Sequence, residues 1–134
     1  MKTLLVLEDE PVLMVLLRHL LKPYRLIEAA TAEQALRLFN DHDRRIDLLL
    51  ADVTLPASSG IQVALLLRSE LPNLPVILTS GYPLSVWAER DAADLGRLGS
   101  NSVAILEKPF KTQVLPNTVR AMVGIVPFEA VRTA

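Results

Sequence analysis

Short, mainly apolar runs recur along this chain, and each is followed by a segment whose apolar residues repeat at helical spacing. The runs predict strands at residues 4–7, 24–28, 46–51, 75–79 and 103–106. The segments between and after them predict helices at residues 11–22, 31–40, 61–71, 84–98 and 112–123, of which the one at 84–98 has the weakest pattern. Five strands that alternate with five helices predict a doubly wound α/β fold, in which helices cover both faces of a parallel sheet.

The length of 134 residues predicts one domain, which we place at residues 1–123. Residues 124–134 then form a short C-terminal tail that is too small for an effector domain. We expect this apolar tail to pack against the Leu-rich first helix, with a homodimer contact as the alternative. Because the N-terminal Met1 directly precedes the first strand, we expect a natural N-terminus there.

The charge balance and the apolar runs exclude several classes of protein. Fourteen Lys and Arg residues against fifteen Asp and Glu residues give a net charge of −1, so we expect no nucleic-acid partner. The run at residues 4–7 is too short to cross a bilayer and is followed at once by acidic residues, which predicts a cytoplasmic protein with no membrane partner. The chain has no Cys, so disulfides and thiolate metal sites are excluded.

Polar residues follow or end four of the predicted strands. Glu8 and Asp9 follow the first strand, Asp52 ends the third, Ser80 ends the fourth and Lys108 comes after the fifth. The carboxyl ends of the strands in an open parallel sheet form the crevice in which ligands bind. Each residue alone has an ordinary explanation as a helix cap, a turn or a solvated loop. Their joint position at the strand ends favours a functional site instead.

The residue types at these positions suggest a chemistry. Three carboxylates that lie close together repel one another unless a cation compensates them, and oxygen ligands favour a hard cation such as Mg²⁺. A carboxylate such as Asp52 is also a competent nucleophile for phosphoryl transfer, which demands mainly positioning and charge stabilisation. Lys108 and the hydroxyl of Ser80 could each contact one phosphoryl oxygen.

These residues resemble the motifs of the bacterial response regulator receiver family. The similarity rests on Glu8-Asp9, on Asp52-Val53-Thr54-Leu55-Pro56 with Gly60, on Ser80-Gly81 and on Lys108-Pro109-Phe110, and it spans roughly residues 2–123. The resemblance implies a flavodoxin-like or CheY-like sheet with strand order 2-1-3-4-5.

The resemblance also implies a role for each matching residue. Asp52 would accept a phosphoryl group from a histidine kinase or a histidine phosphotransfer protein. Mg²⁺ would be bound by Asp9, Asp52 and the backbone carbonyl of Thr54, with Glu8 contributing directly or through water. Lys108 would pair with the phosphoryl group, and Ser80 would move toward it as the switch. Such a protein catalyses only its own phosphorylation and dephosphorylation and acts on a downstream protein target.

Two positions depart from the commonest pattern of the family, and two others are of interest beside them. Glu8 stands where Asp is more usual, which keeps the acidity but lengthens the side chain by one methylene group. Ile105 occupies the place where the family often has a rotating aromatic residue, so we expect a reduced or different aromatic readout. Tyr82 lies where family members modulate the access of the hydrolytic water. Its ring is expected either to slow the loss of phosphate or to serve as a half-buried packing residue. Trp87 is interpreted as a packing or partner-surface residue.

Other functions compete with this interpretation. The chain could be a receiver domain cut from a hybrid sensor kinase, or a phosphorelay intermediate. A phosphohydrolase with an aspartate nucleophile is expected to carry a second Asp two residues later as its general acid. This chain has Thr54 at that position, which disfavours a hydrolase. A degenerate receiver that only holds partners together is disfavoured, because Asp9, Asp52, Ser80 and Lys108 are all present.

Overall fold

Five parallel strands form one sheet at the centre of the protein, and the computed structural model describes residues 1–124 of the chain. The strands are β1 (Thr3–Leu7), β2 (Arg25–Ala29), β3 (Leu48–Asp52), β4 (Val76–Ser80) and β5 (Val103–Glu107). Their order in the sheet is β2-β1-β3-β4-β5, and every neighbouring pair is parallel. The predicted doubly wound α/β fold and its strand order are therefore confirmed.

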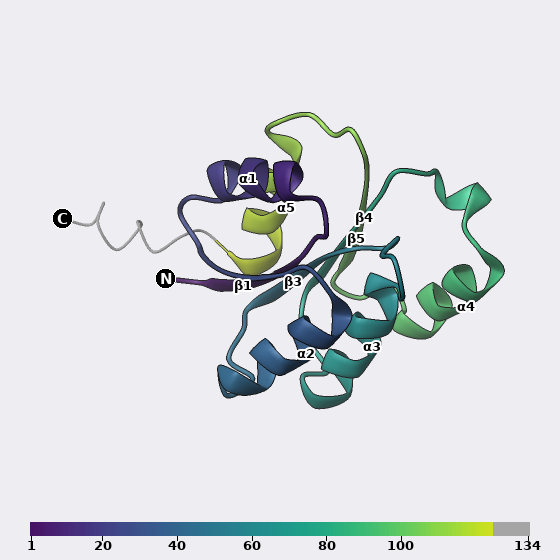
Figure 1. Ribbon diagram of the computed structural model, residues 1–134, viewed down its shortest axis with the longest axis horizontal. Coiled ribbons are helices and arrows are strands. Elements are labelled where there is room, and N and C mark those ends of the chain that lie inside the picture. The colour runs from purple at the N-terminus through teal and green to yellow at the C-terminus, as the bar shows by residue number, and fades with distance from the viewer. Residues whose placement is uncertain (125–134) are drawn as a thin grey trace.

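Five helices cover the two faces of this sheet (Figure 1). They are α1 (Pro11–Leu20), α2 (Ala32–Asp41), α3 (Gly60–Glu70), α4 (Glu89–Leu98) and α5 (Val114–Val123). Helices α1 and α5 lie on one face, and α2 and α3 lie on the other (Figure 1).

Both faces of the central strands are buried because both carry helices. Along β1, Leu4 and Val6 belong to the core beneath α1 and α5, whereas Leu5 and Leu7 belong to the core beneath α2 and α3. All four of these side chains are at most 1% exposed. This two-sided burial explains why the strands read as continuous apolar runs rather than as alternating ones.

The helices begin where the local chemistry favours it. Pro11 occupies the first turn of α1, where its missing N–H costs nothing. The Thr31 hydroxyl accepts a hydrogen bond from the backbone N–H of Gln34, and the Gln34 side chain accepts one from the N–H of Ala30. This reciprocal arrangement satisfies two N–H groups at the start of α2.

The predicted helix at residues 84–98 is wrong in its first third. The structure has a short 3₁₀ turn, η1 (Leu84–Val86), followed by extended backbone at Trp87 and Ala88, and α4 begins only at Glu89. Negative charges favour the first turn of a helix because they face the positive end of its dipole. Glu89 and Asp91 supply such charges, whereas the preceding residues carry none.

Most other elements differ from the predicted ranges by one or two residues at an end. Strand β3 begins at Leu48 rather than at residue 46, and Asp47 just before it bonds to Thr3 instead, with its carboxylate accepting from the Thr3 N–H at 2.8 Å. Helix α5 begins at Val114 rather than at residue 112, and Pro116 lies in its first turn.

Within residues 1–124, none of the helices is both long enough and apolar enough to cross a membrane. The predicted packing of the tail at residues 124–134 against α1, and the alternative dimer contact, concern residues that lie outside the described part of the chain apart from Gly124.

Candidate functional site

The structure brings the predicted acidic residues together at the carboxyl ends of β1 and β3. Glu8 and Asp9 follow β1 directly, and Asp52 is the last residue of β3. One carboxylate oxygen from each of these three residues lies within 4.8 Å of the others. Because β1 and β3 are parallel neighbours, residues at their carboxyl ends necessarily share one edge of the sheet.

Lys108 crosses from the loop after β5 to join this acidic cluster. Its Nζ donates to Oδ2 of Asp52 at 2.8 Å and to Oε1 of Glu8 at 3.3 Å. The Glu8 side chain is only 2% exposed and the Asp52 side chain 7%, so both charges are almost fully removed from water. Two buried carboxylates next to one another require such a positive partner.

Burial and charge act on the pKa of Glu8 in opposite directions. Burial raises its pKa, whereas the hydrogen bond from the Glu10 backbone N–H and the charge of Lys108 lower it, and the net pKa is raised. For Lys108, burial lowers the pKa, but the hydrogen bond and charge of Asp52 together with the charge of Glu8 outweigh burial and raise it. The fold therefore keeps Lys108 protonated next to Asp52.

The backbone around Asp52 holds its carboxylate in one orientation. Oδ1 accepts a hydrogen bond from the Thr54 N–H at 3.1 Å, while Oδ2 accepts from Lys108. The N–H of Val53 donates to the Thr79 carbonyl at 2.8 Å, which ties the loop after β3 to β4. Gly60 packs directly against the Asp52 backbone, since a Cβ atom there would overlap the Asp52 carbonyl oxygen.

The three carboxylates form a donor set that fits a hard divalent cation. Glu8, Asp9 and Asp52 each offer an oxygen, and Asp9 is more exposed than the other two. Such oxygen ligands suit Mg²⁺, which keeps several of its own waters. The acidic cluster could therefore bind a metal.

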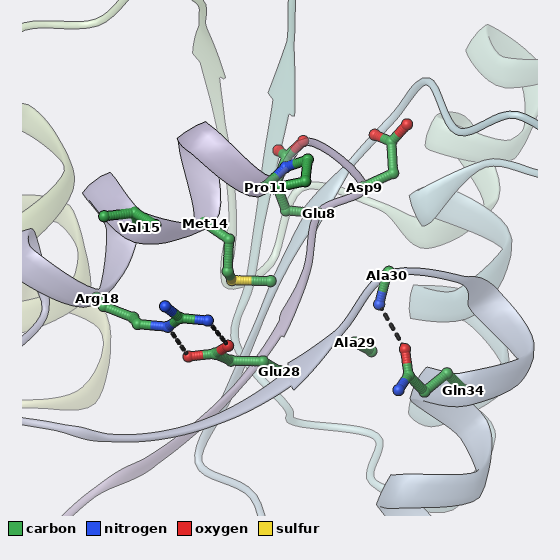
Figure 2. A pocket seen from close by; sticks show the side chains of 10 residues that line it. All are labelled: Glu8, Asp9, Pro11, Met14, Val15, Arg18, Glu28, Ala29, Ala30 and Gln34. Atoms are coloured by element: carbon green, nitrogen blue, oxygen red, sulfur yellow. Dashed lines mark hydrogen bonds and ion pairs between the residues drawn. The ribbon is translucent and has the colours of Figure 1, made fainter.

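A pocket of about 380 Å³ opens beside the acidic cluster, between α1 and the end of β2 (Figure 2). Glu8 and Asp9 lie at one side of it and Arg18 and Glu28 at the other (Figure 2). Arg18 donates two hydrogen bonds to the Glu28 carboxylate, at 2.6 and 2.7 Å. Arg18 thus neutralises the charge of Glu28. The acidic cluster is paired with Lys108 instead.

The hydroxyl of Ser80 points to its own loop in this structure. Ser80 ends β4, is 1% exposed, and donates through Oγ to the Tyr82 carbonyl at 2.9 Å while accepting from the Tyr82 N–H at 3.1 Å. Its backbone carbonyl accepts from the N–H of Lys108 at 2.7 Å. Ser80 is therefore linked to Lys108 by its backbone, whereas its hydroxyl is engaged elsewhere.

The two residues predicted to modulate the site lie farther out. Tyr82 is 60% exposed at the start of the β4–α4 loop. Ile105 lies in β5, is 38% exposed, and lines a groove of about 540 Å³ between β5 and α4 together with Leu84 and Leu95. Position 105 thus borders this groove with an aliphatic side chain and not with an aromatic one.

Several contacts at the site could not be found from the sequence. The shared pairing of Lys108 with both Glu8 and Asp52 depends on its reach across the sheet from β5. The indole N–H of Trp87 donates to the Tyr82 carbonyl at 3.2 Å, although we interpreted Trp87 only as a packing or surface residue. Gly60 was a motif position, and the tight approach to Asp52 supplies its physical reason.

Comparison with known proteins agrees with this geometry. The family model described as the response regulator receiver domain matches residues 4–120. The response regulator GtcR of Aneurinibacillus migulanus is 35% identical over 81% of this chain and 42% of its own length. The polar-differentiation response regulator DivK of Brucella anthropi is 30% identical over 92% of this chain and 97% of its own length.

A solved structure also resembles the protein at a similar level. The receiver domain of the hybrid histidine kinase CckA has a TM-score of 0.72 and is 28% identical, covering 90% of this chain and 98% of that domain. The chain thus spans less than half of GtcR but nearly all of DivK and of the CckA receiver domain.

Proposed function

This chain belongs to the response regulator receiver domain family, and we propose that its Asp52 carboxylate accepts a phosphoryl group in two-component or phosphorelay signalling. The observation that carries this proposal is the pairing of the buried Asp52 and Glu8 carboxylates with one partly buried lysine at the strand ends. Lys108 donates to one Asp52 oxygen and the Thr54 N–H to the other, so the two bonds orient the carboxylate.

The phosphoryl group comes from a phosphorylated histidine of a histidine kinase or histidine phosphotransfer protein. An oxygen of Asp52 attacks phosphorus, the new O–P bond forms as the N–P bond breaks, and the imidazole leaves with the bonding electron pair and takes a proton from water. Three equatorial phosphoryl oxygens then carry the negative charge that must be stabilised. Lys108 is already within 2.8 Å of Asp52, and it pairs with one of them.

Glu8, Asp9, Asp52 and the Thr54 carbonyl would hold Mg²⁺. When bound, this ion neutralises the carboxylates and the incoming phosphoryl oxygens, so that one anion can approach another. Burial raises the pKa of Glu8 by more than the Glu10 backbone hydrogen bond and Lys108 lower it, so the charged carboxylate is only partly compensated. A neighbouring cation would relieve this cost.

Phosphorylation then changes the contacts of the β4 end. The Ser80 hydroxyl leaves the Tyr82 carbonyl and donates to a phosphoryl oxygen, and this movement alters the β4–α4 loop that a partner protein reads. The relatives include a response regulator matched over nearly its whole length and a receiver domain of a hybrid kinase. The proposal is compatible with a stand-alone receiver that acts on a downstream protein target. It is equally compatible with a receiver that belongs to a longer kinase or to a phosphorelay.

The proposed domain spans residues 1–123, and its chemistry is confined to its own phosphorylation and dephosphorylation. Incubation with a small phosphodonor and Mg²⁺, followed by intact mass measurement, tests this. The proposal expects a stable mass increase of one phosphoryl group in the wild type and none in Asp52→Asn. Asp41→Asn, which alters an exposed aspartate, should be labelled like the wild type. Labelling of Asp52→Asn, or steady hydrolysis of the donor without a labelled protein, would contradict it.

The ring of Tyr82 is proposed to slow the loss of phosphate by limiting the access of water. Tyr82 is 60% exposed, so Tyr82→Ala removes little core packing. The variant should lose its phosphoryl group faster than the wild type in a time course of intact mass after the donor is removed. An unchanged rate would remove Tyr82 from the proposal and leave the phosphoacceptor assignment intact.

A further inference from the structure

One backbone carbonyl next to the site receives two side-chain donors from different segments. The Tyr82 carbonyl accepts from the Ser80 hydroxyl at 2.9 Å and from the Trp87 indole N–H at 3.2 Å. Ser80 ends β4, whereas Trp87 lies between η1 and α4. The carbonyl therefore connects the buried end of the sheet with the segment that leads into α4.

The bonding capacity of these groups limits what can happen on phosphorylation. A hydroxyl has one proton, so Ser80 cannot donate to a phosphoryl oxygen and to the Tyr82 carbonyl at the same time. An indole N–H has no role other than donation, and Trp87 can keep its bond when Ser80 leaves. The free-energy cost of losing the Ser80 bond is smaller if the Tyr82 carbonyl keeps the Trp87 bond than if it loses both side-chain donors.

Trp87 is also placed to pass a movement of this carbonyl onward. Its ring packs partly buried against the core beneath α2 and α3. Its backbone is extended and is followed by Ala88, the residue before the first turn of α4. A shift of the Tyr82 carbonyl would therefore move the Trp87 side chain, which packs against the core. Trp87 directly precedes Ala88, the N-cap residue of α4.

We propose that Trp87 is a positioning residue that couples the Ser80 hydroxyl to the start of α4 through their shared bond to the Tyr82 carbonyl. This inference rests on the proposed function, because it concerns what Ser80 does when Asp52 is phosphorylated. It gives the chain a route from the site to its surface that does not need an aromatic residue at position 105.

The tryptophan itself provides the first test, because the chain contains only one. Beryllofluoride with Mg²⁺ serves as the phosphoryl mimic, its binding is measured by fluorine NMR, and Trp87 emission is recorded in the same samples. We expect the emission of the wild type to change as beryllofluoride binds. In Ser80→Ala, beryllofluoride should still bind at saturation, but most of the emission change should be lost.

The second test measures the coupling directly. Trp87→Phe keeps an aromatic side chain but replaces the indole by a smaller phenyl ring without an N–H, so that turning Ser80 away leaves the carbonyl without either side-chain donor. Beryllofluoride affinity should fall roughly 2- to 10-fold, the range expected for one lost hydrogen bond. In a Ser80→Ala background the same substitution should have no effect, because no donor is withdrawn on binding. Val86→Ala, at a 61% exposed neighbour, is the control and should bind normally.

The outcomes separate this inference from the proposal beneath it. An unchanged emission in the wild type at saturation, a full emission change in Ser80→Ala, or an equal effect of Trp87→Phe in both backgrounds would each overturn the coupling while leaving Asp52 as the acceptor. The absence of bound beryllofluoride in the wild type would instead reject the phosphoacceptor assignment, and the coupling with it.

Discussion

Replacing Lys108 by Met tests whether one partly buried lysine holds the acidic cluster together. Met keeps most of the apolar stem and removes the charge. At an effective dielectric constant of 20, the contact with Asp52 at 2.8 Å and that with Glu8 at 3.3 Å correspond to about 6 and about 5 kcal/mol of gross attraction. Desolvation offsets much of this, and removing one partner of a buried pair typically costs ~3–5 kcal/mol.

The expected loss for Lys108→Met is smaller than that range. Its side chain is 19% exposed, and Glu8 can take up a proton because burial already raises its pKa. We therefore expect the free energy of unfolding without Mg²⁺ to fall by about 2–4 kcal/mol. Urea denaturation followed by circular dichroism measures it, with a shift in midpoint at constant slope. Lys111→Met, at an exposed lysine nearby, should change little.

Mg²⁺ separates the charge effect from a packing effect. A cation bound by the three carboxylates replaces the missing positive charge, so Mg²⁺ should stabilise Lys108→Met more than it stabilises the wild type. A loss below about 0.5 kcal/mol, as for an exposed ion pair, would refute the reasoning. So would equal stabilisation of both proteins by Mg²⁺.

Two further predictions concern neighbours of Asp52. The raised pKa of Glu8, due first to burial, means that its stabilising contribution is present below the unfolded value of 4.5 and is lost as pH rises through the folded pKa. Without Mg²⁺, Glu8→Gln should therefore be more stable than the wild type at neutral pH, and this advantage should vanish toward pH 4.5. The variant should also bind Mg²⁺ more weakly. Urea unfolding at several pH values measures the stability difference, with the exposed Glu10→Gln as control, and a difference that stays constant at all pH values would contradict the prediction. Gly60→Ala should destabilise the protein by about 1–3 kcal/mol, because the new Cβ overlaps the Asp52 carbonyl oxygen. In contrast, Gly96→Ala should be neutral or stabilising in thermal unfolding, since a Cβ there meets nothing within 4 Å, and equal effects of the two glycine substitutions would argue against the close approach.

The sheet and the position of its site could be predicted from the sequence for a physical reason. Strands buried on both faces are continuous apolar runs, and parallel strands place their carboxyl ends at one edge. The pattern of apolar and polar residues therefore placed Asp52, the last residue of β3, and Glu8, directly after β1, at the same edge. The neighbouring positions of β1 and β3, which bring the two residues close, were implied by the family resemblance.

Other features depend on tertiary contacts that no local pattern contains. The break before α4 is one in part: the acidic residue Glu89 marks the helix start locally, but the packing of Trp87 against the core accompanies the extended backbone at Trp87 and Ala88. Arg68 is another, because its guanidinium donates to carbonyls after α3 and around the α4–β5 loop, among them Leu74 at 2.9 Å and Asn101 at 2.7 Å. Its position near the end of α3 gives no sign of these partners.

The most direct test of the central claim is to locate the phosphoryl group chemically. After phosphorylation by a small phosphodonor with Mg²⁺, borohydride reduces an aspartyl phosphate to homoserine, and peptide mass spectrometry identifies the converted residue. We expect homoserine at Asp52 alone, dependent on Mg²⁺. Conversion at Asp9 instead, or phosphorylation that leaves no reduced aspartate, would contradict it.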